Sequence, residues 1–334
     1  MQPWSTDVVS AQPSGTRWAL YEGSIALKTA LVITGPTACG KSALAFELAR
    51  QFDIEIISVD SAQVYQGMDL GTAKPSKEQQ CRVPHHLIDI RAPDEPYTAF
   101  DFCQDAEVAM DEIRDRGRLP VLVGGTMLYL KALREGMARL PKADDAVRAE
   151  VLAEADRLGW AALHRELQRI DPEASLRIKP SDTQRLQRAL EVYRLTGRSM
   201  SELIHDGQQG TTTALTEVAI MPPSRSALHE NIAVRFRQML DQGLIGEVEG
   251  LKRDYDLHED LPAMKAVGYR QVWQHLKGQL SADGLFDKAV VATRQLAKRQ
   301  LTWLRAWPQL QQIKEPVLDQ LLKIEEVDNI LSGG

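Results

Sequence analysis

Eight residues near the start of the chain have the types and spacing of a phosphate-binding loop. Residues 35–42 read GPTACGKS and fit the pattern G-x-x-x-x-G-K-[ST]. In such loops, backbone N–H groups at the start of a helix point at an anion. We therefore predict a phosphate or diphosphate site, with Lys41 on the terminal phosphates and Ser42 as a Mg²⁺ ligand. The predicted loop residues are Gly35, Pro36, Thr37, Ala38, Cys39, Gly40, Lys41 and Ser42.

The segments around the loop have the patterns that this kind of site requires. Residues 30–34 form a short apolar run typical of a buried strand, and residues 42–50 have helical character. Apolar runs at 54–59 and 119–123 indicate further strands, and helical segments alternate with them up to about residue 140. This alternation predicts an α/β fold with a parallel sheet and flanking helices.

A mostly helical insertion is expected to interrupt this α/β core. From about 144 to 205 the pattern is helical and rich in arginine, and residues 217–221 read as a strand that returns to the sheet. We expect a flexible N-terminal tail, the first part of the core, the insertion, the second part of the core and a C-terminal tail, at 1–28, 29–143, 144–205, 206–312 and 313–334 respectively.

Two polar residues follow strands at the edge where ligands of open α/β sheets bind. Asp60 comes directly after the strand at 54–59, and Thr126 follows the strand at 119–123 and two glycines. Asp60 should therefore face the phosphate-binding loop. There it would either hold Mg²⁺ through water or accept a proton as a general base. The alternative is a residue that only caps a helix or a turn. Thr126 would either cap the next helix or reach into the same crevice.

A proline-rich stretch at residues 67–98 is expected to form a long functional loop with little regular structure. Lys74 and Arg91 lie in it, and each would either contact phosphates or remain a surface charge. His85 and His86 have no partner at metal-binding spacing, so we predict no structural zinc.

The bulk composition narrows the classes of protein. The chain has 334 residues, of which 43% are hydrophobic and 26% charged. No apolar run approaches the ~18 residues of a membrane span, and the start of the chain lacks the pattern of a signal peptide. Three cysteines without metal-binding spacing favour the cytoplasm. The net charge of −6 argues against binding nucleic acid through bulk charge, although a local basic face remains open.

Such a face is expected near the end of the chain, where residues 293–307 read TRQLAKRQLTWLRAW. At helical spacing Arg294, Lys298 and Arg305 share one side of a helix, with Arg299 beside them. Basic residues interleaved with aromatic ones fit contact with an RNA backbone and unstacked bases. The alternative is a solvated amphipathic helix.

Taken in order along the chain, several longer motifs resemble those of the tRNA dimethylallyltransferase family. The resemblance covers about residues 31–310 and implies a P-loop NTPase-like fold. It rests on GPTACGKS at 35–42, ISVDSAQVYQGMDLGTAKP at 57–75, PHHLIDI at 84–90, LVGGTMLYLKAL at 122–133, DTQRLQRALEVYRLTGRSMSEL at 182–203, RFRQMLDQGLIGEV at 235–248, AVGYRQVW at 266–273 and TRQLAKRQLTWLR at 293–305.

The resemblance implies transfer of a dimethylallyl group from dimethylallyl diphosphate to N6 of the adenosine at position 37 of tRNA. Asp60 would then accept the proton of the amine, and Thr126 would lie near the reacting groups. Lys41 and Mg²⁺, the expected cofactor, would stabilise the leaving diphosphate. The target base would be extruded into a channel. We expect the anticodon stem-loop of tRNA as the partner and a monomeric enzyme.

The resemblance also implies residues that contact tRNA. They come from the segment after the second strand, the helical insertion, the segment near residue 268 and the basic helix. They are Asp60, Ser61, Ala62, Gln63, Gln184, Arg185, Leu186, Gln187, Arg188, Lys265, Gly268, Tyr269, Arg270, Lys298, Arg299, Gln300, Trp303 and Arg305.

The chain departs from the family pattern at several positions. Gln66 and Asn231 stand where the family usually has arginine, and Lys265 stands where arginine or cysteine is more usual. We expect Arg235 to replace the charge missing at 231 and to bind the diphosphate. Cys39 replaces the common serine of the loop, and a thiol at a helix N-terminus can have a lowered pKa.

Three other functions share some of these features. A nucleoside or nucleotide kinase would have the same loop and could use the helical insertion as a lid. A prenyltransferase acting on free adenine nucleotides would share the chemistry but would not need a large clamp. A tRNA-binding protein without activity is the third alternative, and the intact loop and Asp60 argue against it.

Overall fold

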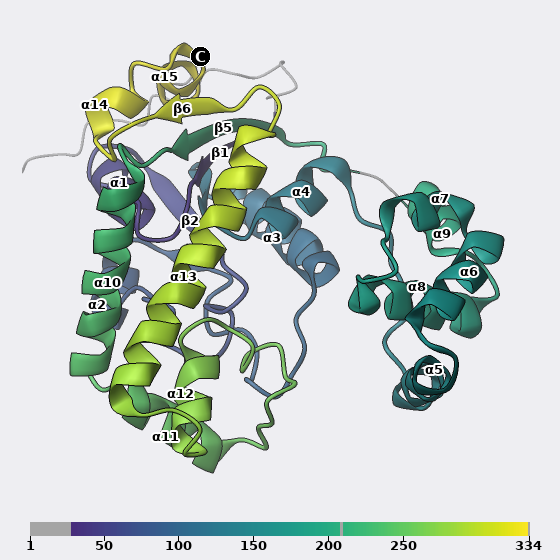
Figure 1. Ribbon diagram of the computed structural model, residues 1–334. Helices are drawn as coiled ribbons and strands as arrows, with labels where there is room; N and C mark the ends of the chain where they lie inside the picture. Colours follow the sequence, from purple (N-terminus) through teal and green to yellow (C-terminus); the bar gives the residue numbers. More distant parts are fainter. Residues whose placement is uncertain (1–27, 208–209, 333–334) are drawn as a thin grey trace, which may run out of the picture.

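The computed structural model describes residues 28–207 and 210–332, which form an α/β core and a separate helical unit (Figure 1). The core is built on a six-stranded, all-parallel sheet with the strand order β3-β2-β4-β1-β5-β6. The strands are β1 (Thr29–Thr34), β2 (Ile54–Val59), β3 (His85–His86), β4 (Leu119–Gly124), β5 (Ala214–Ile220) and β6 (Gln311–Ile313). The α/β fold with a parallel sheet is thereby confirmed.

Helices cover both faces of the sheet because successive strand residues point to opposite sides. Ala30 and Val32 of β1 face the larger core, whereas Leu31 and Ile33 face the smaller one. The larger core is closed by α3 (Ala99–Asp115), α4 (Met127–Glu135), α10 (Arg225–Asp241), α11 (Leu244–Asp254), α12 (Tyr269–Leu276) and α13 (Ala282–Arg305). On the other face, the smaller core is closed by α1 (Lys41–Leu48), α14 (Leu318–Leu321) and α15 (Glu325–Ser332).

Residues 313–332 are part of this core, so the expectation of a C-terminal tail is wrong for them. Ile313 of β6 pairs with Ile220 of β5 and extends the sheet by one strand. Leu321 and Val327 are fully buried against the smaller core. The apolar residues of this segment recur at helical spacing, as at Leu318, Leu321, Ile324 and Val327, and the expectation of a tail overlooked this signal. The expected N-terminal tail lies outside the described residues, except for Lys28.

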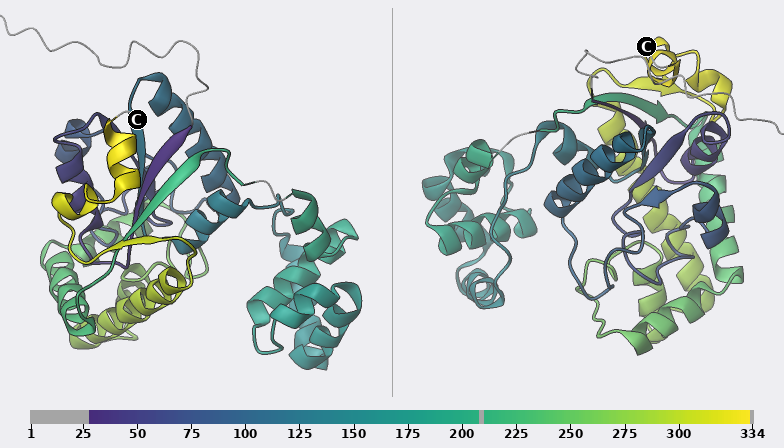
Figure 2. Two further views of the ribbon diagram at one scale, coloured as in Figure 1. Left: turned by 90° about the horizontal axis from the view of Figure 1, so that it is seen from above. Right: turned by 180° about the vertical axis from the view of Figure 1, so that it is seen from behind.

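The helical unit is joined to the core by two connecting segments (Figure 2). Its five helices are α5 (Asp145–Leu158), α6 (Trp160–Ile170), α7 (Pro172–Arg177), α8 (Thr183–Thr196) and α9 (Met200–Gly207). They enclose a small hydrophobic core of their own, with Val151, Leu167 and Leu186 at its centre. Arg188 donates a hydrogen bond to the carbonyl of Pro141 in the first connecting segment, 2.5 Å away, which ties the unit to its connection.

The segment between β2 and α3 is more ordered than its prolines indicate. It contains α2 (Lys77–Arg82), which starts with a capping box at Ser76, and the short edge strand β3. The side chain of Lys74 is 2% exposed and pairs with Asp69 and Asp89, so Lys74 is not a surface charge. It also does not line the active-site cavity described in the next section. The segment is thus held by internal polar contacts.

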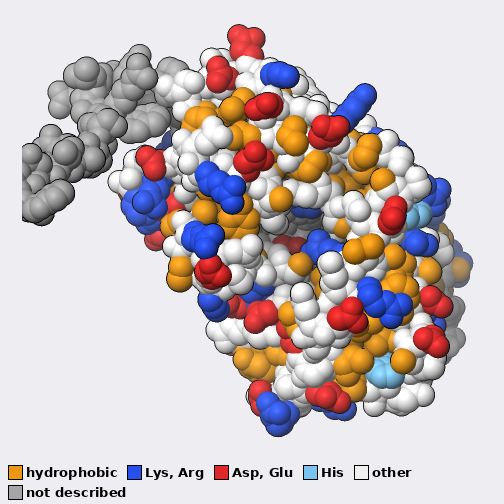
Figure 3. Space-filling model, turned by 90° about the vertical axis from the view of Figure 1, so that its left-hand side faces the viewer, with side chains coloured by type: hydrophobic (Ala, Val, Ile, Leu, Met, Phe, Trp, Pro, Cys, Tyr) orange, Lys and Arg blue, Asp and Glu red, His pale blue; other side chains and the backbone are white. Residues whose placement is uncertain are grey.

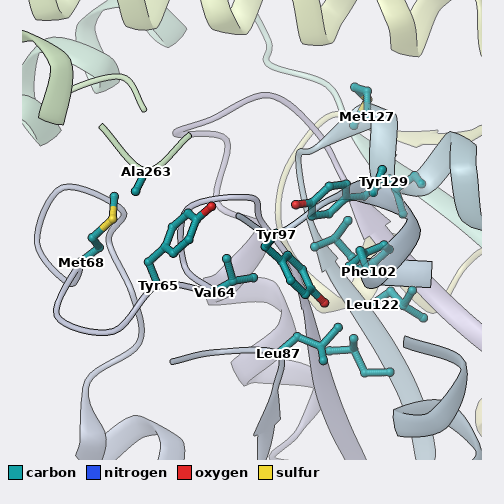
Figure 4. Packing of buried hydrophobic residues seen from close by; sticks show 14 of the residues in the cluster. Val64, Tyr65, Met68, Leu87, Tyr97, Phe102, Leu122, Met127, Tyr129 and Ala263 are labelled. Atoms are coloured by element: carbon teal, nitrogen blue, oxygen red, sulfur yellow. The ribbon is translucent and has the colours of Figure 1, made fainter. Parts of the chain in front are cut away.

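Aromatic side chains attach the same segment to the helices of the larger core (Figure 4). The rings of Phe102 and Tyr129 stack with centroids 4.5 Å apart, and Tyr97 packs edge-on against Tyr129. Tyr97 also donates a hydrogen bond to Asp105 of α3, at 2.9 Å. Among the described residues, no helix is long and apolar enough to cross a membrane.

Candidate active site

The carboxyl ends of the central strands open into a cavity with a volume of about 850 Å³. Figure 3 shows a hollow on the side of the molecule where α1 and α10 lie in Figure 1, and residues of both helices line the cavity. Four cationic groups and one carboxylate face this space. They are Lys41, Asp60, Arg235, Lys265 and Arg299. The excess of positive charge favours an anionic ligand.

The phosphate-binding loop uses glycine where a side chain would not fit. A Cβ at Gly35 would lie 2.7 Å from the carbonyl oxygen of Ile220. Gly40 adopts φ 92° and begins α1 without a side-chain cap, which leaves the first N–H groups of this helix available to a ligand. Lys41 lies at the same place, and its ammonium donates hydrogen bonds to the carbonyls of Gly35 and Pro36 at 3.0 and 2.8 Å.

Arg235 of α10 lines the same cavity. Burial lowers its pKa, and the neighbouring charges of Asp60 and Cys39 act against this change. Among the described residues it makes no ion pair, so its donors are available to a ligand. Asn231, one turn earlier, is exposed and does not line the cavity. The structure thus presents Arg235, and not residue 231, to the site.

Asp60 directly follows β2 and forms a tight turn with the next residues. Its Oδ1 accepts hydrogen bonds from the N–H groups of Ala62 and Gln63, at 2.9 and 3.3 Å. No hydrogen bond to its second oxygen is found within the described part of the chain. One carboxylate oxygen is therefore used for positioning, and the other is available for chemistry in the cavity.

Thr126 faces the cavity and does not cap α4. Its hydroxyl makes no capping hydrogen bond, although the residue occupies the position before the helix. The Oγ1 accepts a hydrogen bond from the N–H of Ser61 at 3.1 Å, and the N–H of Thr126 donates to the carbonyl of Val59. Of the two roles open from sequence, the structure supports the one in the crevice. Thr126 also joins the ends of β2 and β4.

Gln300 of α13 connects the two loops that flank the site. Its Oε1 accepts a hydrogen bond from the N–H of Thr37, and its Nε2 donates to the carbonyl of Gly125, at 2.9 and 2.8 Å. The residue is only 7% exposed. A Cβ at Gly125 would lie 2.5 Å from Nε2, so glycine is required for this contact. The sequence placed Gln300 in an RNA-binding helix but contained no signal for this bridge.

Glu247 of α11 holds the segment after Asp60 in a similar way. Its carboxylate accepts hydrogen bonds from the N–H groups of Asp69 and Leu70, at 3.2 and 2.7 Å, and from the hydroxyl of Tyr269 at 2.5 Å. Sequence reasoning missed Glu247 because its backbone partners Asp69 and Leu70 lie 178 and 177 positions away along the chain. The same contact explains why Tyr269 is fully buried, with its ring against Gly71.

The residues predicted to contact tRNA occupy different environments. Gln184 and Arg185 are exposed at the start of α8. The cavity is lined by Asp60, Ser61, Ala62, Gln63, Lys265, Arg299, Gln300 and Trp303. Leu186 is fully buried in the core of the insertion, which excludes contact through its side chain on an outer surface. Tyr269 is fully buried in the larger core but lines the cavity, so only a group inside the cavity can reach it. The remaining ones lie at the surface, between helices or at a helix start. They are Gln187, Arg188, Gly268, Arg270, Lys298 and Arg305.

The donor set in the cavity limits how a metal ion could be held. No group of three or more His, Cys, Asp or Glu side chains that could bind a metal occurs in the described ranges. Ser42, at the start of α1, and Asp60 supply a hydroxyl and a carboxylate to the same cavity. Mg²⁺ commonly takes few protein ligands and completes its shell with water and substrate phosphates. The residues present therefore fit a Mg²⁺ ion that arrives with a diphosphate.

Comparison with known proteins relates this site to one family. The family model described as IPP transferase matches residues 63–307, and the model described as isopentenyl transferase matches residues 28–94. The full-length tRNA isopentenylpyrophosphate transferase of Bacillus halodurans is 36% identical, with 92% of this chain and 96% of that chain covered and a TM-score of 0.63.

Two further solved structures are similar. The tRNA delta(2)-isopentenylpyrophosphate transferase of Staphylococcus epidermidis is 32% identical, with 92% and 99% covered and a TM-score of 0.62. A eukaryotic dimethylallyltransferase acting on tRNA shares the fold, with 24% identity, coverage of 92% and 80% and a TM-score of 0.71. The family model covers most of the chain and the first two structures cover nearly all of both chains, so this chain belongs to the IPP transferase family.

Proposed function

We propose that the protein transfers the dimethylallyl group of dimethylallyl diphosphate to N6 of the adenosine at position 37 of tRNA. In this reaction a bond forms between N6 and C1 of the dimethylallyl group. The bond between C1 and the diphosphate oxygen breaks, and its electron pair leaves with the diphosphate. The observation that carries the proposal is one cavity in which a phosphate-binding loop, a free carboxylate oxygen and a basic, aromatic helix meet.

The diphosphate would bind at the start of α1. The N–H groups of that helix end, Lys41 and Arg235 would contact its oxygens, and negative charge grows on these oxygens as the C1–O bond breaks. Donors already in place for developing charge lower a barrier more than donors that must reorient. Lys41 would exchange its present contacts with the carbonyls of Gly35 and Pro36 for contacts with phosphate.

Asp60 would accept the proton that N6 loses when it forms the new bond. Its Oδ1 is fixed by two backbone N–H groups, so the second oxygen has a defined position at the cavity wall. Thr126 fixes the neighbouring backbone through Ser61 and would keep the carboxylate near the base. The first requirement for a general base is that it lies within hydrogen-bond distance of the proton, and its pKa is the second.

The adenosine would enter beside α13, where Arg299 and Trp303 line the cavity. Trp303 is 37% exposed, and its ring offers a surface on which an unstacked base can pack. The exposed Gln184 and Arg185 of the insertion would contact the tRNA backbone further away.

Mg²⁺, held by Ser42 and the diphosphate, would neutralise part of the negative charge of the diphosphate when bound. A monomeric, cytoplasmic enzyme is part of the same proposal.

Transfer of radiolabelled dimethylallyl diphosphate to unmodified tRNA tests this proposal, with ATP and free AMP assayed in parallel. The matched control is the same tRNA with another base in place of the adenosine at position 37. We expect label in the first tRNA and none in the second. Label on AMP alone would indicate a prenyltransferase acting on free nucleotides. Consumption of ATP without transfer of label would indicate a kinase.

A further inference from the structure

A second pocket lies on the other side of α13, outside the active-site cavity. It has a volume of about 440 Å³ and is formed between the start of α10 and the second half of α13, two helices that pack side by side (Figure 1). None of its residues lines the active-site cavity. Its polar lining residues are Ser224, Arg225, His229, Arg294, Gln295, Lys298 and Arg305.

The charge in this pocket is all of one sign. Four of the lining residues carry a permanent positive charge (Arg225, Arg294, Lys298 and Arg305), and no aspartate or glutamate lines the pocket. None of the four makes an ion pair with any residue in the described ranges. The arrangement is unusual in a chain with a net charge of −6, because like charges gathered without counter-charges destabilise a folded protein. A bound anion would remove this repulsion.

Two further observations indicate that acceptors are missing. The Nε of Arg294 is shielded from solvent and has no hydrogen-bond partner within the described part of the chain. A guanidinium has only donors, so a buried one calls for acceptor oxygens nearby. The pKa of His229 is lowered by burial and by the charges of Arg294 and Arg225, in line with the gathering of positive charge described above.

The end of α10 adds to the same potential. Ser224 caps the helix by accepting a hydrogen bond from the N–H of Ala227, and α10 is 17 residues long. The positive end of its dipole therefore lies at the pocket, beside Arg225. Apolar residues of the lining such as Val291 and Leu301 would contact the sugar part of a ligand that presents a phosphate to the cations.

We propose that this pocket binds backbone phosphates of the RNA substrate. The inference rests on the proposed function. An α-helix with its side chains is about 10 Å across, so the pocket lies within a few nucleotides of a base that enters the cavity beside α13. Lys298 and Arg305 lie in the family's RNA-binding helix. The new elements are Arg225 and Arg294, which extend the RNA contact to α10. The occupant is a phosphodiester of RNA, and a free polyphosphate, which has the same oxygens, is the alternative that the test separates.

The test uses the full-length chain with the double substitution Arg225→Gln and Arg294→Gln. The matched control is Arg50→Gln with Arg253→Gln, which removes two exposed charges outside both pockets. Binding of unmodified tRNA is measured at several salt concentrations. The KM values for tRNA and for dimethylallyl diphosphate, and the heat of binding of inorganic diphosphate, are measured on the same proteins. Arg225→Gln alone is added because Arg225 is exposed and its loss should not disturb folding.

We expect weaker tRNA binding in the double variant. For two lost phosphate contacts, the slope of log affinity against log salt should become shallower by about 0.7 to 0.9 per contact. The KM for tRNA should rise a few-fold in parallel, with the KM for dimethylallyl diphosphate unchanged and the control like wild type. Arg225→Gln alone should show about half the change in slope.

Two outcomes would overturn the inference. One is an unchanged salt slope and unchanged tRNA affinity in a double variant that is folded and active. The other is the loss of a second binding site for inorganic diphosphate with tRNA binding unaffected, which would assign the pocket to a free polyphosphate. If wild-type protein binds tRNA but transfers no label to it, the proposed function fails instead, and the binding data still decide the role of this pocket.

Discussion

Strand β2 has a carboxylate near each end, and the two are held in opposite ways. Glu55, near the amino end, is 2% exposed and accepts hydrogen bonds from Arg116, Arg118 and His86. Asp60, just past the carboxyl end, is half-buried and accepts hydrogen bonds through one oxygen, both from its own turn.

We infer from this difference that Glu55 stabilises the fold and that Asp60 takes part in the proposed reaction. Burial alone would raise the pKa of Glu55, but the hydrogen bonds and charges of Arg116 and His86 lower it to about 2. A group so strongly held in its ionised form cannot accept a proton near neutral pH. Asp60 keeps one oxygen facing the cavity and has Arg235 as a charged neighbour. In this proposal the carboxylate near the amino end of β2 stabilises the fold, and the one after its carboxyl end serves the reaction.

The largest effect that tests this division is expected for Asp60→Asn. Asparagine keeps an acceptor for the N–H groups of Ala62 and Gln63 but cannot take a proton, so kcat should fall by about 10²- to 10⁴-fold with the fold intact. Single-turnover transfer to tRNA measures the loss. Asp254→Asn, at an exposed position outside the cavity, is the control. A decrease of less than about threefold would rule out Asp60 as the base.

Arg235→Gln should have the next largest effect on activity. Loss of one donor from a charge-stabilising site commonly costs about 10²- to 10³-fold in rate. The KM for dimethylallyl diphosphate should rise as well, because the diphosphate loses a contact before the reaction. The control is Arg237→Gln on the same helix, since Arg237 lies over the ring of Phe286 and does not line the cavity. Equal rates in the two variants would remove Arg235 from the site.

At the other edge of the sheet, Glu55→Gln should affect stability and not turnover. The pKa of Glu55 is about 2 in the folded protein, against 4.5 for the free group. Its contribution of about 3 kcal/mol is therefore complete above pH ~4.5 and is lost as the pH falls toward ~2. Urea unfolding of wild type and variant across this range measures it. The two curves should converge in acid, and a constant difference would contradict the assignment.

The sequence predicted the parts of the site that follow a strand directly. The loop at 35–42, Asp60 and Thr126 each follow a strongly apolar strand, and parallel strands bring such ends to one edge. Their positions in one cavity follow from local pattern and topology alone. The strand His85–His86 was missed because a two-residue strand has no periodicity, and its register is set by β2.

Contacts between distant residues were beyond the reach of such patterns. Gln300 meets Thr37 across 263 positions, and Glu247 meets Leu70 across 177. Nothing in the local sequence marks a glutamine or a glutamate as the partner of a distant backbone N–H. One side of α13 lines the cavity and another lines the second pocket. Helical spacing groups Arg294, Lys298 and Arg305 on one side, but it does not predict which side faces the cavity.

Gln300 tests whether the cavity edge depends on such distant contacts. Gln300→Leu leaves the N–H of Thr37 and the carbonyl of Gly125 without partners, at a cost of about 1–3 kcal/mol. We expect kcat to fall by about tenfold, with little change in the KM for tRNA. Gln300→Glu keeps the acceptor for Thr37 and should recover part of the rate. Gln238→Leu, exposed on α10, is the control. A change confined to the KM for tRNA would make Gln300 an RNA contact instead.

The smallest effect is expected in the insertion, at Arg185→Gln. Arg185 is exposed and bonded only to Asp182 of the same helix start, so its loss should not disturb the core around Leu186. Removal of one phosphate contact should raise the KM for tRNA a few-fold and reduce the salt slope of binding by about one, with kcat unchanged. Arg165→Gln, exposed on α6, is the matched control. A fall in kcat at saturating tRNA would mean that the insertion affects the chemical step. The contrast between the cavity wall held by Gln300, which acts in the reaction, and the exposed surface of the insertion, which only binds tRNA, would then be wrong.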